Sequence, residues 1–409
     1  MHLYELPMIF VLIGLILYVV LAGADFGAGF WQLLAGRGPA GERMRDHAHH
    51  SMAPVWEANH VWLIFVLTIT WTAYPSVFGA IASTLSVPLF IAAMGIVLRG
   101  ASYALRAGAA GGREQRLLDR VFSISSILTP FALGTMVGAI ASRRVPVGNA
   151  AGHMFSSWLN PTSLLVGVLA VGTSAYLAAV FLAADAARLA DADLEARLRT
   201  RALGAGLLAG ALAIVGLVVL RFDAHPLYHR LLHSAALAVL VLSIGAGVAT
   251  LELVRRSLFE AARYSAALAV ASVIASWAIA QNPLLLRGLT VRQAAAPHDT
   301  LIAVLVAVLV GGVVLFPSLA LLFRLVLRGQ LDHGAERPQP SLTGVRLLSA
   351  SACGLLARAA GACLLAGFSF LTLAEAPWAH TIGVLALLAF IVLGFLAAVP
   401  SQLEDYGSV

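Results

Sequence analysis

The chain has 409 residues, of which 60% are hydrophobic and only 11% are charged. An ordinary soluble domain carries roughly a quarter charged residues, and a single core could not bury this much apolar surface. The composition therefore excludes a water-soluble enzyme, a disordered protein and a nucleic-acid-binding protein. It predicts an all-α, polytopic integral membrane protein. The formal net charge of +6 does not point to nucleic acid, because the arginines fall in short loops between apolar runs.

Apolar stretches long enough to cross a bilayer, which takes about 20 residues, recur along the whole chain. The sequence predicts about eleven transmembrane helices connected by loops. They lie near residues 6–34, 54–74, 77–106, 117–140, 161–187, 202–220, 231–253, 262–280, 299–326, 350–373 and 380–399.

Arginines are distributed unevenly between the two sets of alternate loops. If the N-terminus is outside, the cytoplasmic loops and their flanking helix ends carry 19 arginines and the outer segments carry 6. Because positive residues are retained on the cytoplasmic side, this asymmetry predicts an outer N-terminus and a cytoplasmic C-terminus.

Two carboxylates stand inside apolar helices. They are Asp25, within LAGADFGAGF, and Glu57, within MAPVWEANHVWL. Acids inside the membrane are costly and point to function. At 1.5 Å per residue, Asp25 lies about 13 Å and Glu57 about 5 Å below the predicted cytoplasmic face, which suits a route for protons from the cytoplasm. The structural alternative is that Asp25 caps a local helix break and Glu57 pairs with an arginine.

The second predicted helix is rich in large side chains with polar tips: Trp56, Asn59, His60 and Trp62. Trp56 and His60 are four residues apart and share a face, with Glu57 beside them. Tryptophan near a helix start is typical of an interfacial anchor. For His60 the sequence favours a hydrogen-bonded buried histidine over a haem or metal ligand, and we add it to the candidate proton path.

Three histidines, His47, His49 and His50, precede this helix. We expect them to lie in a solvated cytoplasmic loop, with metal binding as the minor alternative.

Arg99 and Arg106 end the third predicted helix and Asp119 opens the fourth. The two arginines are either charge anchors at the cytoplasmic face or partners that hold an anionic group or neutralise Asp25 and Glu57.

Small residues predict close helix contacts at two places. Gly23 and Gly27 form a GxxxG pattern around Asp25. In the fourth helix, Pro130 followed by Gly134 and Gly138 predicts a bend and close packing.

Taken in order, these segments resemble subunit II of the cytochrome bd quinol oxidases, including the cyanide-insensitive members. The matching blocks are GADFGAG at 23–29, APVWEANHVWL at 53–63, RGASYALR at 99–106, the block at 129–131, LNPTSLLVG at 159–167, YLAAVFLAADA at 176–186, WAIAQNPLLL at 277–286 and LTVRQAAAPHDTL at 289–301. The resemblance implies a nine-helix core over residues 1–332 and a C-terminal extension over 333–409 with two further helices.

The resemblance implies a chain of the bacterial cytoplasmic (inner) membrane that pairs with a haem-binding subunit I. That partner holds two haems b and one haem d, or a b-type replacement, oxidises quinol and reduces O2 to water with cytoplasmic protons. This chain is expected to bind no haem, no metal and no nucleic acid and to hold no complete active site. It is expected to contribute a proton route, and a bound quinone or lipid and a small single-helix accessory subunit are further implied contacts.

The family's residues carry over position by position. Asp25 matches its first-helix acid, and Glu57 matches the acid that follows the signature Trp56. His60 departs from the pattern, because the family usually has Glu or Gln there. The remaining signature positions are Asn59, Trp62, Arg99, Arg106, Asp119 and Pro130.

Two other functions stay open at this stage. A secondary transporter is common among eleven-helix chains, although such proteins often show two repeated halves, and no convincing repeat is found here. A diverged, non-enzymatic scaffold paralogue of the oxidase subunit is the second alternative.

Overall fold

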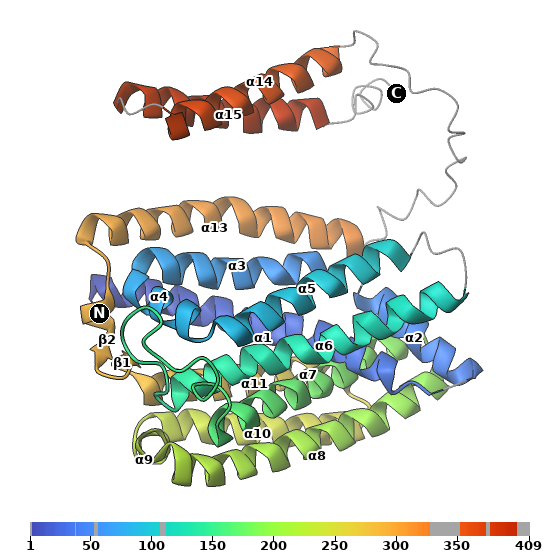
Figure 1. The fold of residues 1–409 in the computed structure, drawn as a ribbon. Helices are drawn as coiled ribbons and strands as arrows, with labels where there is room; N and C mark the ends of the chain where they lie inside the picture. Colours follow the sequence, from blue (N-terminus) through green and yellow to red (C-terminus); the bar gives the residue numbers. More distant parts are fainter. Residues whose placement is uncertain are drawn as a thin grey trace. The chain divides into compact units, whose positions relative to one another are not determined.

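The computed structural model describes residues 2–36, 38–52, 56–106, 112–327, 352–373 and 377–398. Helices dominate these residues (Figure 1), which confirms the expected all-α membrane class. The chain divides into two compact units, Met1–Leu319 and Ala320–Val409. The expected boundary between residues 332 and 333 lies outside the described residues and stays a prediction.

The helices follow the apolar runs closely. The short elements are η1 (Leu3–Glu5), α2 (Pro39–Met52), α4 (Pro75–Thr84), α9 (His225–His233), β1 (Leu284–Leu286), β2 (Leu289–Thr290) and α12 (Val291–Ala294). The long helices are α1 (Leu6–Leu33), α3 (Trp56–Ala73), α5 (Ser86–Arg106), α6 (Gly112–Ala141), α7 (Pro161–Arg188), α8 (Ala192–Asp223), α10 (Ala236–Arg255), α11 (Phe259–Gln281), α13 (His298–Leu327), α14 (Ala352–Leu373) and α15 (Pro377–Ala398).

Eight helical segments within the described residues are long and apolar enough to cross a membrane. Three more expected spans appear there as shorter apolar helices, Asn59–Ala73, Arg358–Gly367 and Thr381–Leu393. The multi-span character is therefore confirmed, while the count of eleven and the outer N-terminus stay predictions.

The predicted helix over 77–106 is wrong as a single element. The chain forms α4 and α5 instead, with a break at Leu85. Pro88 explains the break, because its ring lacks an N–H and would clash with the carbonyl of Thr84 if one helix ran through both residues.

The prediction of a solvated loop around the three histidines is also wrong, because the segment is a helix. Residues 39–52 form α2, whose Met44, His47 and Ala48 are buried against the bundle. Their spacing of three and four residues places them on one helix face. Most of the remaining side chains of α2 are polar or charged, so a prediction based on long apolar runs does not detect this narrow apolar face.

A small antiparallel hairpin interrupts the helical fold after α11. Leu284 pairs with Thr290 and Leu286 with Leu289. The turn is formed by Arg287 and Gly288, and the φ of +81° at Gly288 is a conformation that glycine adopts without penalty. In Figure 1 this hairpin lies at the same end of the bundle as the N-terminus.

Close contacts between small residues hold α1, α6 and α7 together in the middle of the first unit. A Cβ on Gly27 would lie 1.9 Å from the backbone oxygen of Ser174 in α7. A Cβ on Gly134 would lie 2.8 Å from the Cα of Gly167, so α6 meets the same helix in the same way. The close packing predicted from these glycines is confirmed, and its physical basis is direct backbone contact.

Gly27→Ala should destabilise the bundle, because the added methyl group can be accommodated only if α1 and α7 separate. We expect a loss of about 1–3 kcal/mol or more, as in other overpacked interiors, seen as a lower thermal midpoint of the detergent-solubilised chain. Gly210→Ala is the matched control, since nothing lies within 4 Å of that position in α8. Equal midpoints for the two variants would contradict the contact.

Candidate functional site

Asp25 lies in the interior of α1, which continues without a break from Leu6 to Leu33. Its side chain is completely buried. The alternative in which Asp25 caps a local helix break is therefore wrong. A buried carboxylate needs a partner, and the fold supplies one from a helix that begins 61 residues later along the chain.

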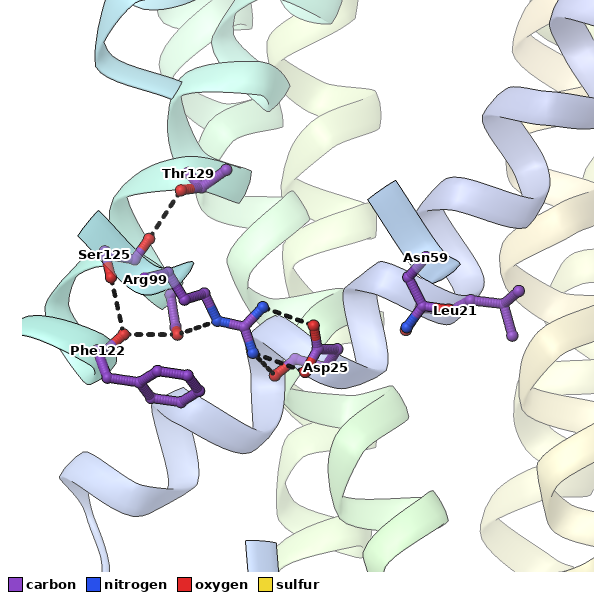
Figure 2. A network of polar contacts seen from close by, with 8 residues as sticks. Leu21, Asp25, Asn59, Arg99, Phe122, Ser125 and Thr129 are labelled. Atoms are coloured by element: carbon purple, nitrogen blue, oxygen red, sulfur yellow. Dashed lines mark hydrogen bonds and ion pairs between the residues drawn. The ribbon is translucent and has the colours of Figure 1, made fainter. Parts of the chain in front are cut away.

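Arg99 of α5 is that partner and is itself only 2% exposed. Its Nη1 donates to Asp25 Oδ2 at 2.5 Å and its Nη2 donates to Oδ1 at 2.6 Å (Figure 2). Nη2 also donates to the backbone oxygen of Asp25 at 3.1 Å. This two-pronged geometry matches the planar guanidinium to the carboxylate, which is the strongest form of the interaction. Of the two readings of Arg99, the one that neutralises Asp25 is thus borne out.

A third helix completes the site. The Nε of Arg99 donates to the Ser126 hydroxyl of α6 at 3.0 Å, and that hydroxyl donates to the Phe122 carbonyl at 2.6 Å. The guanidinium carbon also lies 4.9 Å from the ring centre of Phe26 and 4.6 Å from that of Phe122. Both contacts favour a cation. The pair therefore joins α1, α5 and α6 at one point.

Ser126 and Phe122 were missed by sequence reasoning. The available signal was the run SISS in the middle of an apolar helix, which places hydroxyls at depths where they need partners. The neighbouring Thr129 donates to the Ser125 carbonyl, and a Cβ on Gly95 would lie 2.2 Å from the Thr129 hydroxyl. Glycine at that position lets α5 approach α6 closely enough for Arg99 to reach Ser126.

An aromatic cluster adjoins the ion pair and includes Tyr18 and Phe26 of α1. The ring of His60 in α3 is 6.2 Å from that of Tyr18 and 5.9 Å from that of Phe26, both edge to face. Trp62 packs against the same group of residues. These rings flank the imidazole on two sides, and the His60 side chain is half-buried, so the hydrogen-bonded, buried histidine that we expected stays a prediction.

A hydrogen bond from Asn59 sets the position of α3 along the axis of α1. Its amide donates to the Leu21 carbonyl at 3.3 Å. Together with the contact between His60 and Phe26, this bond places the first turn of α3 beside the segment of α1 that carries Asp25. Trp56 and Glu57 belong to that turn. Their side chains lie outside the described residues, so the roles expected for them stay predictions.

Arg106 pairs with a different acid. Its Nε donates to Asp119 at 2.8 Å, and Asp46 of α2 lies at 4.0 Å. Arg106 and Asp119 are each a little over a quarter exposed, so the bridge ties α5 to α6 near the ends of these helices. Pro130 lies inside α6, which continues to Ala141.

His47 holds α2 against the bundle. Its Nε2 donates to the Leu182 carbonyl of α7 at 3.0 Å, in a buried position. Within the described part of the chain, no three side chains of the metal-ligating types His, Cys, Asp and Glu gather in one place. The expectation of no metal stays a prediction.

A family model described as cytochrome bd terminal oxidase subunit II matches residues 3–326 of this chain. Cytochrome bd ubiquinol oxidase subunit 2 of Bacillus subtilis (strain 168) is 27% identical over 169 residues, which are 41% of this chain and 48% of that protein. Cytochrome bd-I ubiquinol oxidase subunit 2 of Escherichia coli (strain K12) is 28% identical over 173 residues, 39% of this chain and 44% of that protein. The chain thus spans about half the length of these curated relatives.

A solved structure gives broader coverage. In the structure of bd oxidase from Geobacillus thermodenitrificans, one chain aligns with a TM-score of 0.65 at 25% identity. The alignment covers 80% of this chain and 99% of that chain. The first unit described above is therefore similar to a whole chain of a bd oxidase, and the similarity extends well beyond the segments in which the sequences align.

Removing either member of the buried pair should strongly destabilise the folded protein. Arg99→Met leaves the Asp25 carboxylate without its partner and should cost about 3–5 kcal/mol, whereas the double variant Asp25→Leu/Arg99→Met removes both charges and should recover part of the loss. The measurement is the yield and thermal midpoint of the monodisperse protein in detergent.

Arg43→Met provides the matched control. The Arg43–Asp193 bridge has a similar atomic separation, 3.2 Å, but both side chains are more than half exposed. Exposed pairs contribute about 0–1 kcal/mol. If Arg43→Met and Arg99→Met lowered the midpoint equally, burial of the Asp25 pair would not be the source of its importance.

Proposed function

The chain belongs to the cytochrome bd terminal oxidase subunit II family, and from this membership we propose that it serves as the haem-free subunit of a membrane quinol oxidase. In this proposal it assembles with a haem-binding subunit I in a bacterial inner membrane. The complex transfers four electrons from quinol to O2 and forms water, with protons drawn from the cytoplasmic side.

The observation that carries the proposal is the match of the family to residues 3–326, combined with an alignment that covers nearly all of a bd oxidase chain. The same range contains every signature position identified in the sequence. It also contains the buried Asp25–Arg99 pair, whose two members come from two separate signature blocks.

The haems are assigned to the partner subunit. An axial ligand must direct an uncommitted nitrogen or sulfur toward the macrocycle. In this chain His47 uses its Nε2 on the Leu182 carbonyl, and the His60 ring packs between Tyr18 and Phe26. These two environments support the assignment of the haems to the partner subunit.

The first turn of α3 is the proposed point of proton entry. The contacts of Asn59 and His60 with α1 place the first turn of α3, to which Glu57 belongs, beside the segment of α1 that carries Asp25. Placing a proton on Asp25 would leave the Arg99 charge uncompensated in an apolar interior. We therefore assign the proton-carrying role to Glu57, with His60 next along α3, and a positioning role to Asp25.

The partner assignment is tested by purifying the tagged full-length chain from native-like membranes and recording a reduced-minus-oxidised spectrum. We expect a haem-bearing subunit to co-purify and to show either the red chlorin band of haem d or an all-haem-b spectrum. Membranes that carry the untagged chain serve as the control. A haem-free chain without a partner would contradict the oxidase role.

Glu57→Gln should slow oxygen consumption about tenfold or more, because proton delivery by a positioned acid typically contributes larger factors than this. The haem content of the assembled complex should not change. The deficit should grow as the pH rises, since fewer protons then reach the site without the carboxylate. Glu195→Gln, on α8, is the matched control and should retain the parent rate. A Glu57→Gln rate equal to the parent rate at alkaline pH would contradict the proton role.

A further inference from the structure

A pocket of about 270 Å³ lies at the end of the bundle where α6 ends and α7 begins. Two segments far apart in the sequence form it, the connection between α6 and α7 and the tip of the β1–β2 hairpin. Its polar lining consists of three arginines, a histidine and two serines: Arg143, Arg144, Arg287, His153, Ser156 and Ser157. The lining contains no acidic side chain.

Only part of this positive charge is balanced by the protein. Arg144 pairs with Asp223 at 2.8 Å, and the same carboxylate also accepts from the Thr162 hydroxyl. Arg143 and Arg287 form no ion pair with any described residue. Three guanidinium groups in one small pocket repel each other, so an anion in the pocket would stabilise the arrangement.

The end of α6 places Arg143 at the pocket. The Arg143 N–H donates to the Ile140 carbonyl and the Arg144 N–H to the Ala139 carbonyl, which is the Schellman arrangement at a helix C-terminus. The residue in the left-handed position is normally glycine, but here it is Arg143 with φ at 59°. Ala190 and Ser257 take the same position after α7 and α10, so this helix ending recurs in the chain, and at α6 it brings the Arg143 side chain to the pocket.

His153 adds a hydrogen-bond donor. Its Nδ1 accepts from the backbone N–H groups of Phe155 and Ser156, at 3.3 and 3.2 Å. The proton of the neutral ring therefore sits on Nε2, which is a donor. Arginines with neutral N–H and O–H donors between them are the groups that bind tetrahedral oxyanions.

The position of the pocket is informative as well. It follows directly on the membrane-crossing segment Glu114–Ala141, and in Figure 1 this end of the bundle also carries the N-terminus and the hairpin. Under the predicted topology this is the outer face. By the positive-inside rule that face is poor in arginine, and only 6 of the chain's 26 arginines lie in the outer segments. Half of those 6 line this one pocket.

We propose that this pocket binds a phosphate-type oxyanion, presented either by an anionic phospholipid headgroup or by free phosphate. Its volume lies just below the roughly 300–1,000 Å³ of ordinary small-molecule sites, which suits one phosphoryl group. The site is separate from the Asp25–Arg99 pair and does not depend on the oxidase activity.

The test is a calorimetric titration of the full-length chain in detergent with two probes, inorganic phosphate and dihexanoyl phosphatidylglycerol. Arg143→Gln/Arg287→Gln should weaken binding at least about tenfold, because it removes two charge-assisted contacts. Arg292→Gln is the matched control, since Arg292 is exposed on α12 and does not line the pocket. It should stay within about twofold of the parent affinity. If the double variant does not fold, Arg287→Gln alone, at the exposed hairpin tip, serves in its place.

The two probes distinguish the sources of the phosphoryl group. Binding of the lipid without measurable binding of phosphate supports a headgroup site, whereas equal affinity for both supports a free oxyanion. The proposal is overturned if neither probe binds the parent chain more tightly than it binds the arginine variants.

Discussion

The ion pair between Asp25 and Arg99 is the constraint to which the surrounding helices conform. Two charges in an apolar interior are tolerated only when they meet in good geometry and their remaining hydrogen-bonding atoms are satisfied. This requires α1, α5 and α6 to approach within the reach of one arginine side chain. The small residues around the pair make that approach possible, since Gly29 lies against Ser126 and Gly95 against Thr129. The charged site and the glycine pattern are therefore two parts of one structural requirement.

The sequence predicted the helices well and the contacts between them poorly. Apolar runs mark membrane-crossing helices because length and hydrophobicity are properties of one segment. The sequence also identified Asp25 and Arg99 as unusual, but it left the partner of each open. The two residues are 74 positions apart, and nothing in the segment between them indicates which helices become neighbours. The sequence did not predict the short elements, for a different reason. A narrow apolar face, as on α2, or a proline near a helix start, as at Pro88, produces only a weak pattern.

The proposed division of roles between the two intramembrane acids rests on the surroundings of Asp25. Asp25 makes all its strong interactions with one arginine, and such an arrangement favours a fixed charge. Glu57 belongs to the first turn of a helix that Asn59 and His60 hold against α1. A carboxylate that carries protons must gain and lose them without breaking a structural pair. Asp25, which lies inside the ion pair, is therefore a better candidate for positioning than for carrying protons.

The two arginine sites differ in how their charge is balanced, and their depth explains the difference. At Arg99, inside the bundle, the protein supplies the counter-charge itself, because no ion can follow from the solvent into a packed apolar interior. At Arg143 and Arg287, at the end of the bundle, solvent and lipid headgroups are accessible, and the fold provides one carboxylate for three guanidinium groups. These guanidinium groups are at least partly exposed, so water solvates them, and the proposed anion would add to that stabilisation. The same electrostatic requirement thus produces a closed structural pair at one depth and an open binding site at the other.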